Sequence, residues 1–144
     1  MAFFDSSISY FELDRSQGGA VVDLSAYITD VDGLPGSLKL NDVTAIGATS
    51  ESTHPSTKSA SIAISGNWDD AATTGLDAVI GAIYTAGQTQ TLTFGYGPEG
   101  NQSSDIKYSG ECWIEDYSVK SAVGNQVTFS ATLRVSGAVA RGTY

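Results

Sequence analysis

Alternation of apolar and polar residues is the commonest pattern in the chain. The clearest run covers residues 127–136, where its apolar row consists of Val127, Phe129, Ala131, Leu133 and Val135. A period of two is typical of a strand with one buried face. Shorter runs of this kind predict strands within 62–64, 92–96 and 106–114, and less regular apolar stretches predict bent strands over 20–24, 28–32 and 38–46.

One segment has a helical period instead. Its apolar residues follow the spacing i, i+3, i+4, i+7 and i+8, and they are Leu76, Val79, Ile80, Ile83 and Tyr84. This spacing predicts a single helix over about 74–86, which begins after Asp69 and Asp70 with Thr73 or Thr74 as its cap, and ends at Gly87. The patterns together predict a mainly β fold with one covering helix in a single domain, residues 1–144.

Three segments are irregular. Residues 47–59 contain Ser, Thr and His54 with hardly an apolar residue, which predicts a long loop. In residues 1–19 the aromatic side chains are interspersed with Ser, Asp and Gly. This pattern predicts either an arm that binds a partner or an N-terminal edge strand. Residues 138–144 are expected to form a C-terminal tail.

The charge of the chain excludes some functions. Sixteen acidic against seven basic side chains give a net charge of −9, which argues against binding of phosphate backbones. The 19 Ser and 14 Thr predict a surface rich in hydroxyl groups. The apolar runs are too short for a membrane-spanning helix, no export signal is recognisable, and the single Cys112 has no partner for an internal disulfide.

No catalytic, metal or cofactor-binding constellation is expected. Gly95, Gly97 and Gly100 match a dinucleotide-binding pattern in letters only, because a strand and not a helix follows them, and the stretch 97–100 predicts a hairpin turn. Asp30 and Asp32 before Gly33 are better explained by turn chemistry than by a calcium loop. His54 is isolated.

Cys112 falls on the apolar side of its strand, where a thiol is typically an inert core residue. Glu111 and Glu115 form either a carboxylate pair of the glycosidase type or part of a solvated sheet face. Trp113, between these two glutamates, suggests a contact with another subunit or a secondary cluster.

Several strings in order resemble the tail tube proteins, or major tail proteins, of long-tailed bacteriophages. They are Asp23–Gly36, Asp42–Gly47, Ser65–Asp70, Tyr96–Gly100 and Phe129–Gly137. The resemblance implies a β-sandwich or barrel-like unit of the tail-tube type with a flanking helix. It also implies hexameric rings that stack into the hollow conduit for DNA ejection, with a tape measure protein and tail terminator and tip proteins as partners. The subunit would be made in the host cytoplasm and reside in the virion.

This interpretation assigns roles to surface residues. The polar rows of two neighbouring strands are candidates for the channel wall, past which DNA moves without specific binding, namely Ser109, Glu111, Glu115, Thr128, Ser130 and Thr132. The arm, the loop and the C-terminal tail, together with the exposed tryptophan, supply candidate contacts between subunits. They are Phe3, Phe4, Tyr10, Phe11, Glu51, His54, Lys58, Trp113, Arg141 and Tyr144.

Two other classes of protein remain as alternatives. A carbohydrate-binding or adhesive β-sandwich module would use Trp68, Trp113 and tyrosines as a coplanar stacking platform, although Trp68 beside Asp69 and Asp70 fits better as an anchor at the start of the helix. A glycosidase would use Glu111 and Glu115. The sequence favours the tube over both.

Overall fold

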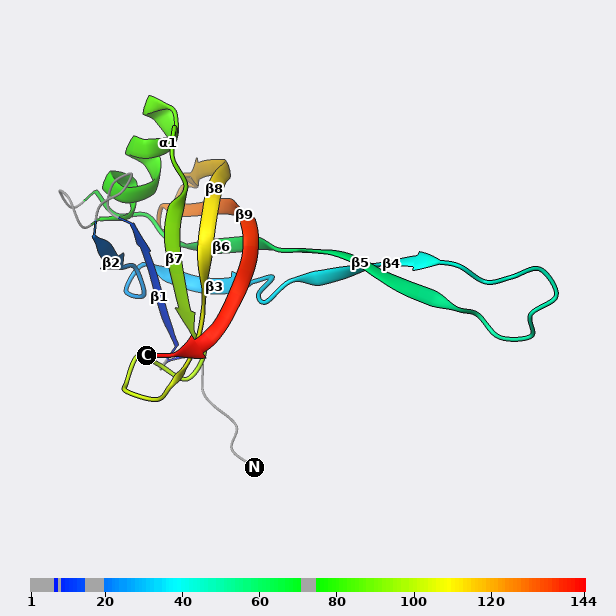
Figure 1. Cartoon of the computed structure of the whole chain (residues 1–144). Helices are drawn as coiled ribbons and strands as arrows, with labels where there is room; N and C mark the ends of the chain where they lie inside the picture. The colour runs from blue at the N-terminus through cyan, green and yellow to red at the C-terminus, as the bar shows by residue number, and fades with distance from the viewer. Residues whose placement is uncertain (1–6, 8, 15–19, 71–74) are drawn as a thin grey trace.

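The computed structural model describes residues 7, 9–14, 20–70 and 75–144. This part of the chain forms nine strands and one helical segment (Figure 1). The strands are β1 (Tyr10–Asp14), β2 (Val21–Asp23), β3 (Ile28–Asp32), β4 (Ser37–Asp42), β5 (Thr53–Ser59), β6 (Ser61–Asn67), β7 (Leu92–Gly97), β8 (Ile106–Lys120) and β9 (Thr128–Thr143). The helical segment is a short π-helix, Asp77–Gly81, followed by α1 (Ala82–Ala86).

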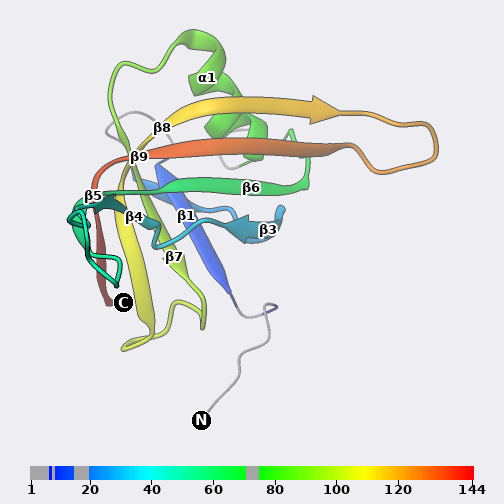
Figure 2. The ribbon, with the colours of Figure 1, turned by 90° about the vertical axis from the view of Figure 1, so that its right-hand side faces the viewer.

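Seven of the strands form one antiparallel sheet in the order β2-β1-β7-β8-β9-β6-β3. The long strands β8 and β9 bend along their length and belong to both parts of the sheet, so the sheet folds into two halves (Figure 2). The β7 half consists of β2, β1, β7, residues 106–112 of β8 and residues 135–143 of β9. The β6 half consists of β3, β6, residues 113–120 of β8 and residues 128–134 of β9. The predicted sandwich-like β fold with a flanking helix is confirmed.

The hydrophobic core lies between the two halves, and the helical segment closes it at one end (Figure 1). Each half contributes alternate residues, such as Leu13 and Phe94 from the β7 half and Ile64 and Leu133 from the β6 half, all at most 2% exposed. The helix contributes a stripe of buried side chains: Leu76, Val79, Ile80 and Ile83. The predicted helix is therefore confirmed, although Tyr84, the last residue of the predicted stripe, is 43% exposed.

The C-terminal end of the helix agrees with the prediction made from the sequence. Gly87 has a φ of 92° and its N–H donates to the carbonyl of Ile83, so it terminates α1 as predicted. Thr73 and Thr74, the predicted caps, lie outside the described residues. The predicted turn at 97–100 also forms, with a hydrogen bond of 3.2 Å from the N–H of Gly100 to the carbonyl oxygen of Gly97.

The predicted loop 47–59 is wrong in its second half. Residues Thr53–Ser59 form β5, which pairs with β4 and makes a two-stranded hairpin that projects well beyond the body (Figure 1). The predicted strand 38–46 ends at Asp42, and residues 43–52 form the tip. Every residue of both strands is exposed, so the hairpin has no buried face, and β5 has no apolar row from which a strand could be predicted. The strand predicted over 28–32 is confirmed as β3, and it contains Asp30 and Asp32, for which the sequence also indicated turn chemistry before Gly33.

The two ends of the described chain belong to the sheet. Tyr10–Asp14 pairs with both β2 and β7 and buries Phe11 and Leu13, so the strand interpretation holds for these residues. The predicted C-terminal tail 138–144 is wrong, because β9 continues to Thr143, which lies opposite Ile106.

Candidate channel wall and subunit edges

The open face of the β6 half is a continuous surface of small polar side chains. Residues opposite one another in an antiparallel ladder point to the same side of a sheet. One such row runs across four strands through Ser118, Ser130, Ser65 and Asp30. The hydroxyl oxygens of Ser118 and Ser130 lie 2.9 Å apart, which places both side chains on this face.

A β-bulge at Glu115 keeps this face polar. Ile114 lies opposite Leu133 and Asp116 lies opposite Thr132, so Glu115 is an extra residue in β8. Before the bulge, Ile114 points to the core, and after it the buried row continues through Tyr117, opposite Ala131. The residues of β8 that point to the open face consequently have odd numbers before the bulge and even numbers after it. Strict alternation from Cys112 and Ile114 would have placed Asp116 and Ser118 on the wrong side.

The same face carries more negative than positive charge. Its acidic side chains are Asp30, Asp32, Glu115 and Asp116, and its basic side chains are Lys120 and Arg134. Glu115 and Arg134 form a long ion pair of 3.9 Å between exposed groups, so they hold each other weakly. Hydroxyl groups occupy most of the space between these charges.

The six predicted wall residues separate into two groups. Thr128, Ser130, Thr132 and Glu115 belong to the open face of the β6 half. Ser109 and Glu111 belong to the β7 half, which points in another direction because the sheet bends between them (Figures 1 and 2). Thr128, Ser130 and Thr132 lie on a regular part of β9, whereas the ladder between β8 and β9 shifts its register between Ser109 and Glu111 and again at Glu115.

The outer face of the β7 half is less open. Glu111 accepts hydrogen bonds from the hydroxyls of Thr91 (3.0 Å) and Thr93 (2.6 Å). The Asp14 carboxylate accepts one from the N–H of Thr93 at 2.8 Å and is only 4% exposed. This burial raises the pKa of Asp14 above its usual value. These carboxylates therefore form their hydrogen bonds within the subunit.

Both long edges of the β6 half are unpaired within the described chain. β3 pairs with β6 on one side only. On the other edge, β7 pairs with β8 no further than Cys112, and the side chain of Gln88 takes over: its amide donates to the carbonyl of Cys112 (3.1 Å) and accepts from the N–H of Ile114 (2.8 Å). Beyond Ile114, β8 has no strand on this side. Nothing in the sequence signals this substitution of a side chain for a strand.

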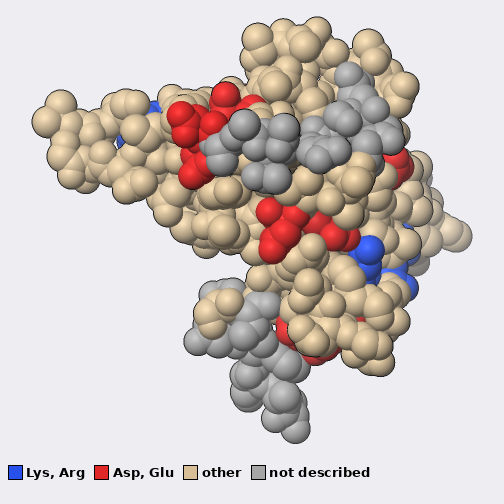
Figure 3. Space-filling model, turned by 90° about the vertical axis from the view of Figure 1, so that its left-hand side faces the viewer, with Lys and Arg blue, Asp and Glu red and all other residues tan. Residues whose placement is uncertain are grey.

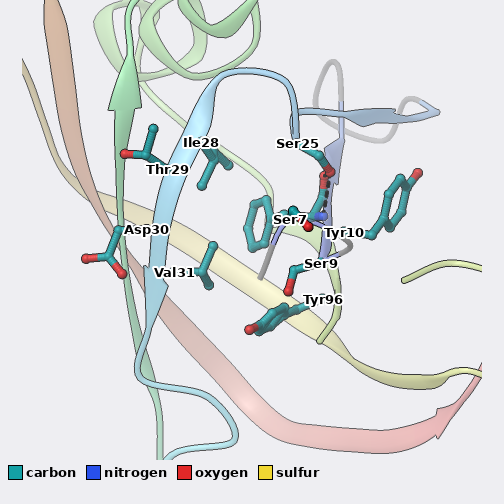
Figure 4. A pocket seen from close by; sticks show the side chains of 10 residues that line it. Ser7, Ser9, Tyr10, Ser25, Ile28, Thr29, Asp30, Val31 and Tyr96 are labelled. Atoms are coloured by element: carbon teal, nitrogen blue, oxygen red, sulfur yellow. Dashed lines mark hydrogen bonds between the residues drawn. The ribbon is translucent and has the colours of Figure 1, made fainter. Parts of the chain in front are cut away.

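A pocket of about 360 Å³ lies at the seam where β1 and β3 approach without pairing (Figure 4). Its apolar side is formed by Phe11, Ile28 and Val31, and Tyr96 of β7 contributes a ring. The hydroxyls of Ser9 and Ser25 belong to its polar side. Sequence reasoning missed this pocket because its residues come from three separate segments.

The predicted contacts between subunits have different surroundings. Glu51, His54 and Lys58 are exposed on the hairpin, and Arg141 is exposed on β9. Trp113, 38% exposed, lies opposite Arg134 on the open face. Phe11, in contrast, is 2% exposed and belongs to the core, so it is unavailable for such a contact. Phe3 and Phe4 lie outside the described residues.

Two further candidates, Tyr10 and Tyr144, contact each other. Their rings lie 5.7 Å apart at 83°, and the Lys107 ammonium lies 4.8 Å from the centre of the Tyr144 ring. Lys107 also pairs with Glu12 at 3.3 Å. These contacts attach the end of β9 to β1 through side chains.

The two tryptophans do not form a sugar-stacking platform. Trp68 donates from its indole nitrogen to the Tyr117 hydroxyl at 3.2 Å, and this hydroxyl donates to the Asp77 carboxylate at 3.1 Å. Trp68 therefore anchors the start of the helix, as predicted, while Trp113 lies on the opposite face of the sheet.

Nothing in the described residues suggests catalysis or a metal centre. Cys112 is fully buried, and burial raises the pKa of its thiol to about 12, which keeps it protonated and unreactive. Across the described ranges, no group of three or more His, Cys, Asp or Glu side chains is placed to hold a metal ion. None of the helices in this part of the chain has the length and apolar character to cross a membrane.

Comparison with known proteins rests on structure alone. No protein-family model matches the sequence, and no curated protein is significantly similar to it. Among solved structures, the SPP1 tail tube superposes with a TM-score of 0.77 at 12% identity, over 99% of this chain and 80% of that one. The tail of an empty gene transfer agent particle, of C6 symmetry, superposes with a TM-score of 0.72 at 17% identity, over 99% of this chain and 100% of that one.

A third similar structure comes from a contractile system. The sheath/tube terminator of the extracellular contractile injection system PVC gives a TM-score of 0.62 at 12% identity, over 92% of this chain and 93% of that one. Each of these matches covers at least 92% of this chain, and therefore includes residues of both halves of the bent sheet. The chain therefore has the fold of tail tube proteins.

Proposed function

We propose that this chain is the structural subunit of a phage-type tail tube, in which six copies form a ring and rings stack around a channel for DNA. The observation that carries the proposal is the combination of a tail-tube fold over the full length with a four-stranded half-sheet that has two unpaired edges and an open polar face. The subunit would reside in the virion, with the tape measure, terminator and tip proteins as further partners.

The unpaired edges supply a means of closing a ring. An exposed edge presents backbone N–H and C=O groups that seek a partner strand. β8, β9, β6 and β3 alternate in direction, so β3 of one copy is antiparallel to β8 of a neighbour placed beside it. Two different edges meeting in this way make a head-to-tail contact, which generates a closed ring when the rotation per copy is right. The C6 symmetry of the gene transfer agent tail supports six copies.

Ring closure would turn the open face of the β6 half into the channel wall. The other face of this half already packs on the core, so the body of each subunit lies outside the closed sheet. The wall would then consist of hydroxyl groups with an excess of carboxylates, which repel DNA phosphates at short range and leave no basic stripe to hold them. At physiological salt this repulsion extends about 8 Å from the wall.

The β4–β5 hairpin is suited to joining one ring to the next. It carries exposed apolar side chains far from the body, including Leu40 at 56% and Ile46 at 107% exposure (Figure 1). Such exposure on a projecting element is typical of an interaction surface. The face of the molecule opposite the hairpin carries several groups of Asp and Glu side chains, with Lys and Arg atoms at the right and a few near the upper left (Figure 3).

Electron microscopy of the purified protein tests the proposal. At high concentration we expect hollow filaments whose cross-section has six-fold symmetry. A protein that stays monomeric under all conditions, including addition to tails assembled from its partner proteins, would contradict it.

A matched pair of variants tests the role of the hairpin. Ile46→Asp should block stacking, whereas Val123→Asp should not, although both side chains are fully exposed in the subunit. Equal loss of filaments in both variants would show that the hairpin has no special part in stacking.

A further inference from the structure

We propose that β3 and β8 of neighbouring copies pair in one defined register, with Asp30 opposite Lys120, Val31 opposite Val119, and Asp32 opposite Ser118 of the neighbour. This inference rests on the proposed function and adds to it the residues that join two copies within a ring. The charges and the apolar side chains of the subunit favour this register, and the stagger of the sheet excludes the register with Asp30 opposite Ser118.

Side-chain direction limits the registers first. Asp30 and Asp32 point to the open face, because they lie opposite Ser65 and Ala63, while Val31 points to the core side opposite Ile64. Along β8, Ser118 and Lys120 point to the open face, opposite Ser130 and Thr128. Since paired residues share a face, Asp30 must meet Asp116, Ser118 or Lys120, and the allowed registers differ in steps of two.

Charge then distinguishes these registers. In the register that places Asp30 opposite Asp116, these two carboxylates face each other. In the register that places Asp30 opposite Ser118, the carboxylates of Asp32 and Asp116 face each other. Like charges directly opposite each other destabilise a strand pair. Asp30 opposite Lys120 avoids both repulsions and adds an attraction between exposed groups. A register shifted by two more residues would leave a single pair of opposed residues between the two strands, because β8 ends at Lys120.

The core side of the same register places apolar groups together. Val119 is 46% exposed in the subunit and pairs with Phe129 of β9, while the other edge of β8 has no partner strand among the described residues at this point. Val31 is half-buried and lines the seam pocket, where Figure 4 shows it on β3 beside Tyr96. Pairing of Val31 with Val119 brings the exposed valine of one copy to the pocket of the next, where it removes apolar surface from water on both.

The stagger of the sheet gives the third argument. Within one copy, Asp30 shares a row with Ser65, Ser130 and Ser118. Asp30 opposite Ser118 of the neighbour would continue this row without displacement and leave the strands of the closed ring parallel to its axis. Closed sheets need strands that tilt relative to the axis, which a register displacement produces. Asp30 opposite Lys120 displaces each copy by two residues, and Asp30 opposite Asp116 does so in the other direction, so the stagger excludes the Ser118 register and the charges decide between the other two.

Charge exchange tests the proposed pair directly. Asp30→Lys and Lys120→Asp should each reduce filament formation at least tenfold, measured by sedimentation, and the double variant should restore it. Asp32→Lys is the control, because Asp32 faces Ser118 and its change should reduce assembly less than Asp30→Lys. Failure of the double variant to assemble better than either single variant would overturn the register.

Disulfide trapping tests the register independently. Oxidised filaments of Val31→Cys/Val119→Cys should give ladders of linked copies on non-reducing gels, and those of Asp32→Cys/Asp116→Cys, which match the unstaggered register, should not. The natural Cys112 is fully buried and does not compete.

The outcomes separate the two proposals. Ladders from the second pair alone, in filaments that form normally, would overturn the register and leave the tube intact. Wild-type protein that never forms filaments would overturn the proposed function instead.

Discussion

Gly81 provides a sharp test of how the helix packs on the sheet. It is buried in the helical segment, and a Cβ at this position would collide with the Oδ1 atom of Asp77 and lie 3.3 Å from the ring of Tyr117. The same Oδ1 atom accepts the hydrogen bond from the Tyr117 hydroxyl, which in turn accepts from Trp68. A methyl group at Gly81 therefore displaces the carboxylate on which this chain of hydrogen bonds ends.

Two opposing contributions determine how much Gly81→Ala changes the free energy of unfolding. Ala is favoured over Gly inside a helix by about 1 kcal/mol. A hydrogen bond to a charged group contributes about 1.5–3 kcal/mol, and it is lost when the carboxylate moves. Gly81→Ala should thus lower the free energy of unfolding by roughly 0.5–2 kcal/mol, although helix propensity alone predicts the opposite sign.

A double-mutant cycle checks the cause. In an Asp77→Ala background the collision with the carboxylate is absent, so Gly81→Ala should be neutral or should stabilise by up to about 1 kcal/mol. Urea unfolding of the unassembled subunit, followed by tryptophan fluorescence, measures both steps, and gel filtration confirms that no filaments are present. Stabilisation by Gly81→Ala in the wild-type background would refute the packing argument.

Three other predictions follow from burial. Leu133→Ala, at a fully buried site, should lower the free energy of unfolding by about 2–5 kcal/mol, and the neighbouring exposed Arg134→Ala by less than about 1, in urea titrations. Iodoacetamide at pH 8 should leave Cys112 unmodified until the protein unfolds, as read by mass spectrometry, because burial raises its pKa to about 12. Burial also raises the pKa of Tyr117 to about 12, so the folded state holds this proton more tightly than the unfolded state, whose pKa is about 10. The stability that Tyr117 contributes should therefore be complete below pH ~10 and disappear as the pH rises towards 12, and in Tyr117→Phe the urea midpoint should fall less over this range.

The regular strands and the helix follow from the sequence because each has one buried and one exposed face. Val127 to Val135 shows the period of two, and Leu76 to Ile83 shows the helical period, so burial leaves a readable signal in both. Neither face of the hairpin β4–β5 is buried, and only β4 shows an alternation, through Leu38 and Leu40. The second strand, β5, has no apolar row, which is why its sequence predicts a loop.

The composition of the surface, the mainly β core with its covering helix and the polar rows of the regular strands can all be inferred from the sequence. Which of these rows share a surface depends on the tertiary structure. The bulge at Glu115 reverses the alternation along β8, and the bend separates Glu111 from Ser130. The unpaired edges and the seam pocket are likewise tertiary, because they depend on which strands fail to meet, and the period of a single strand carries no information about its neighbours.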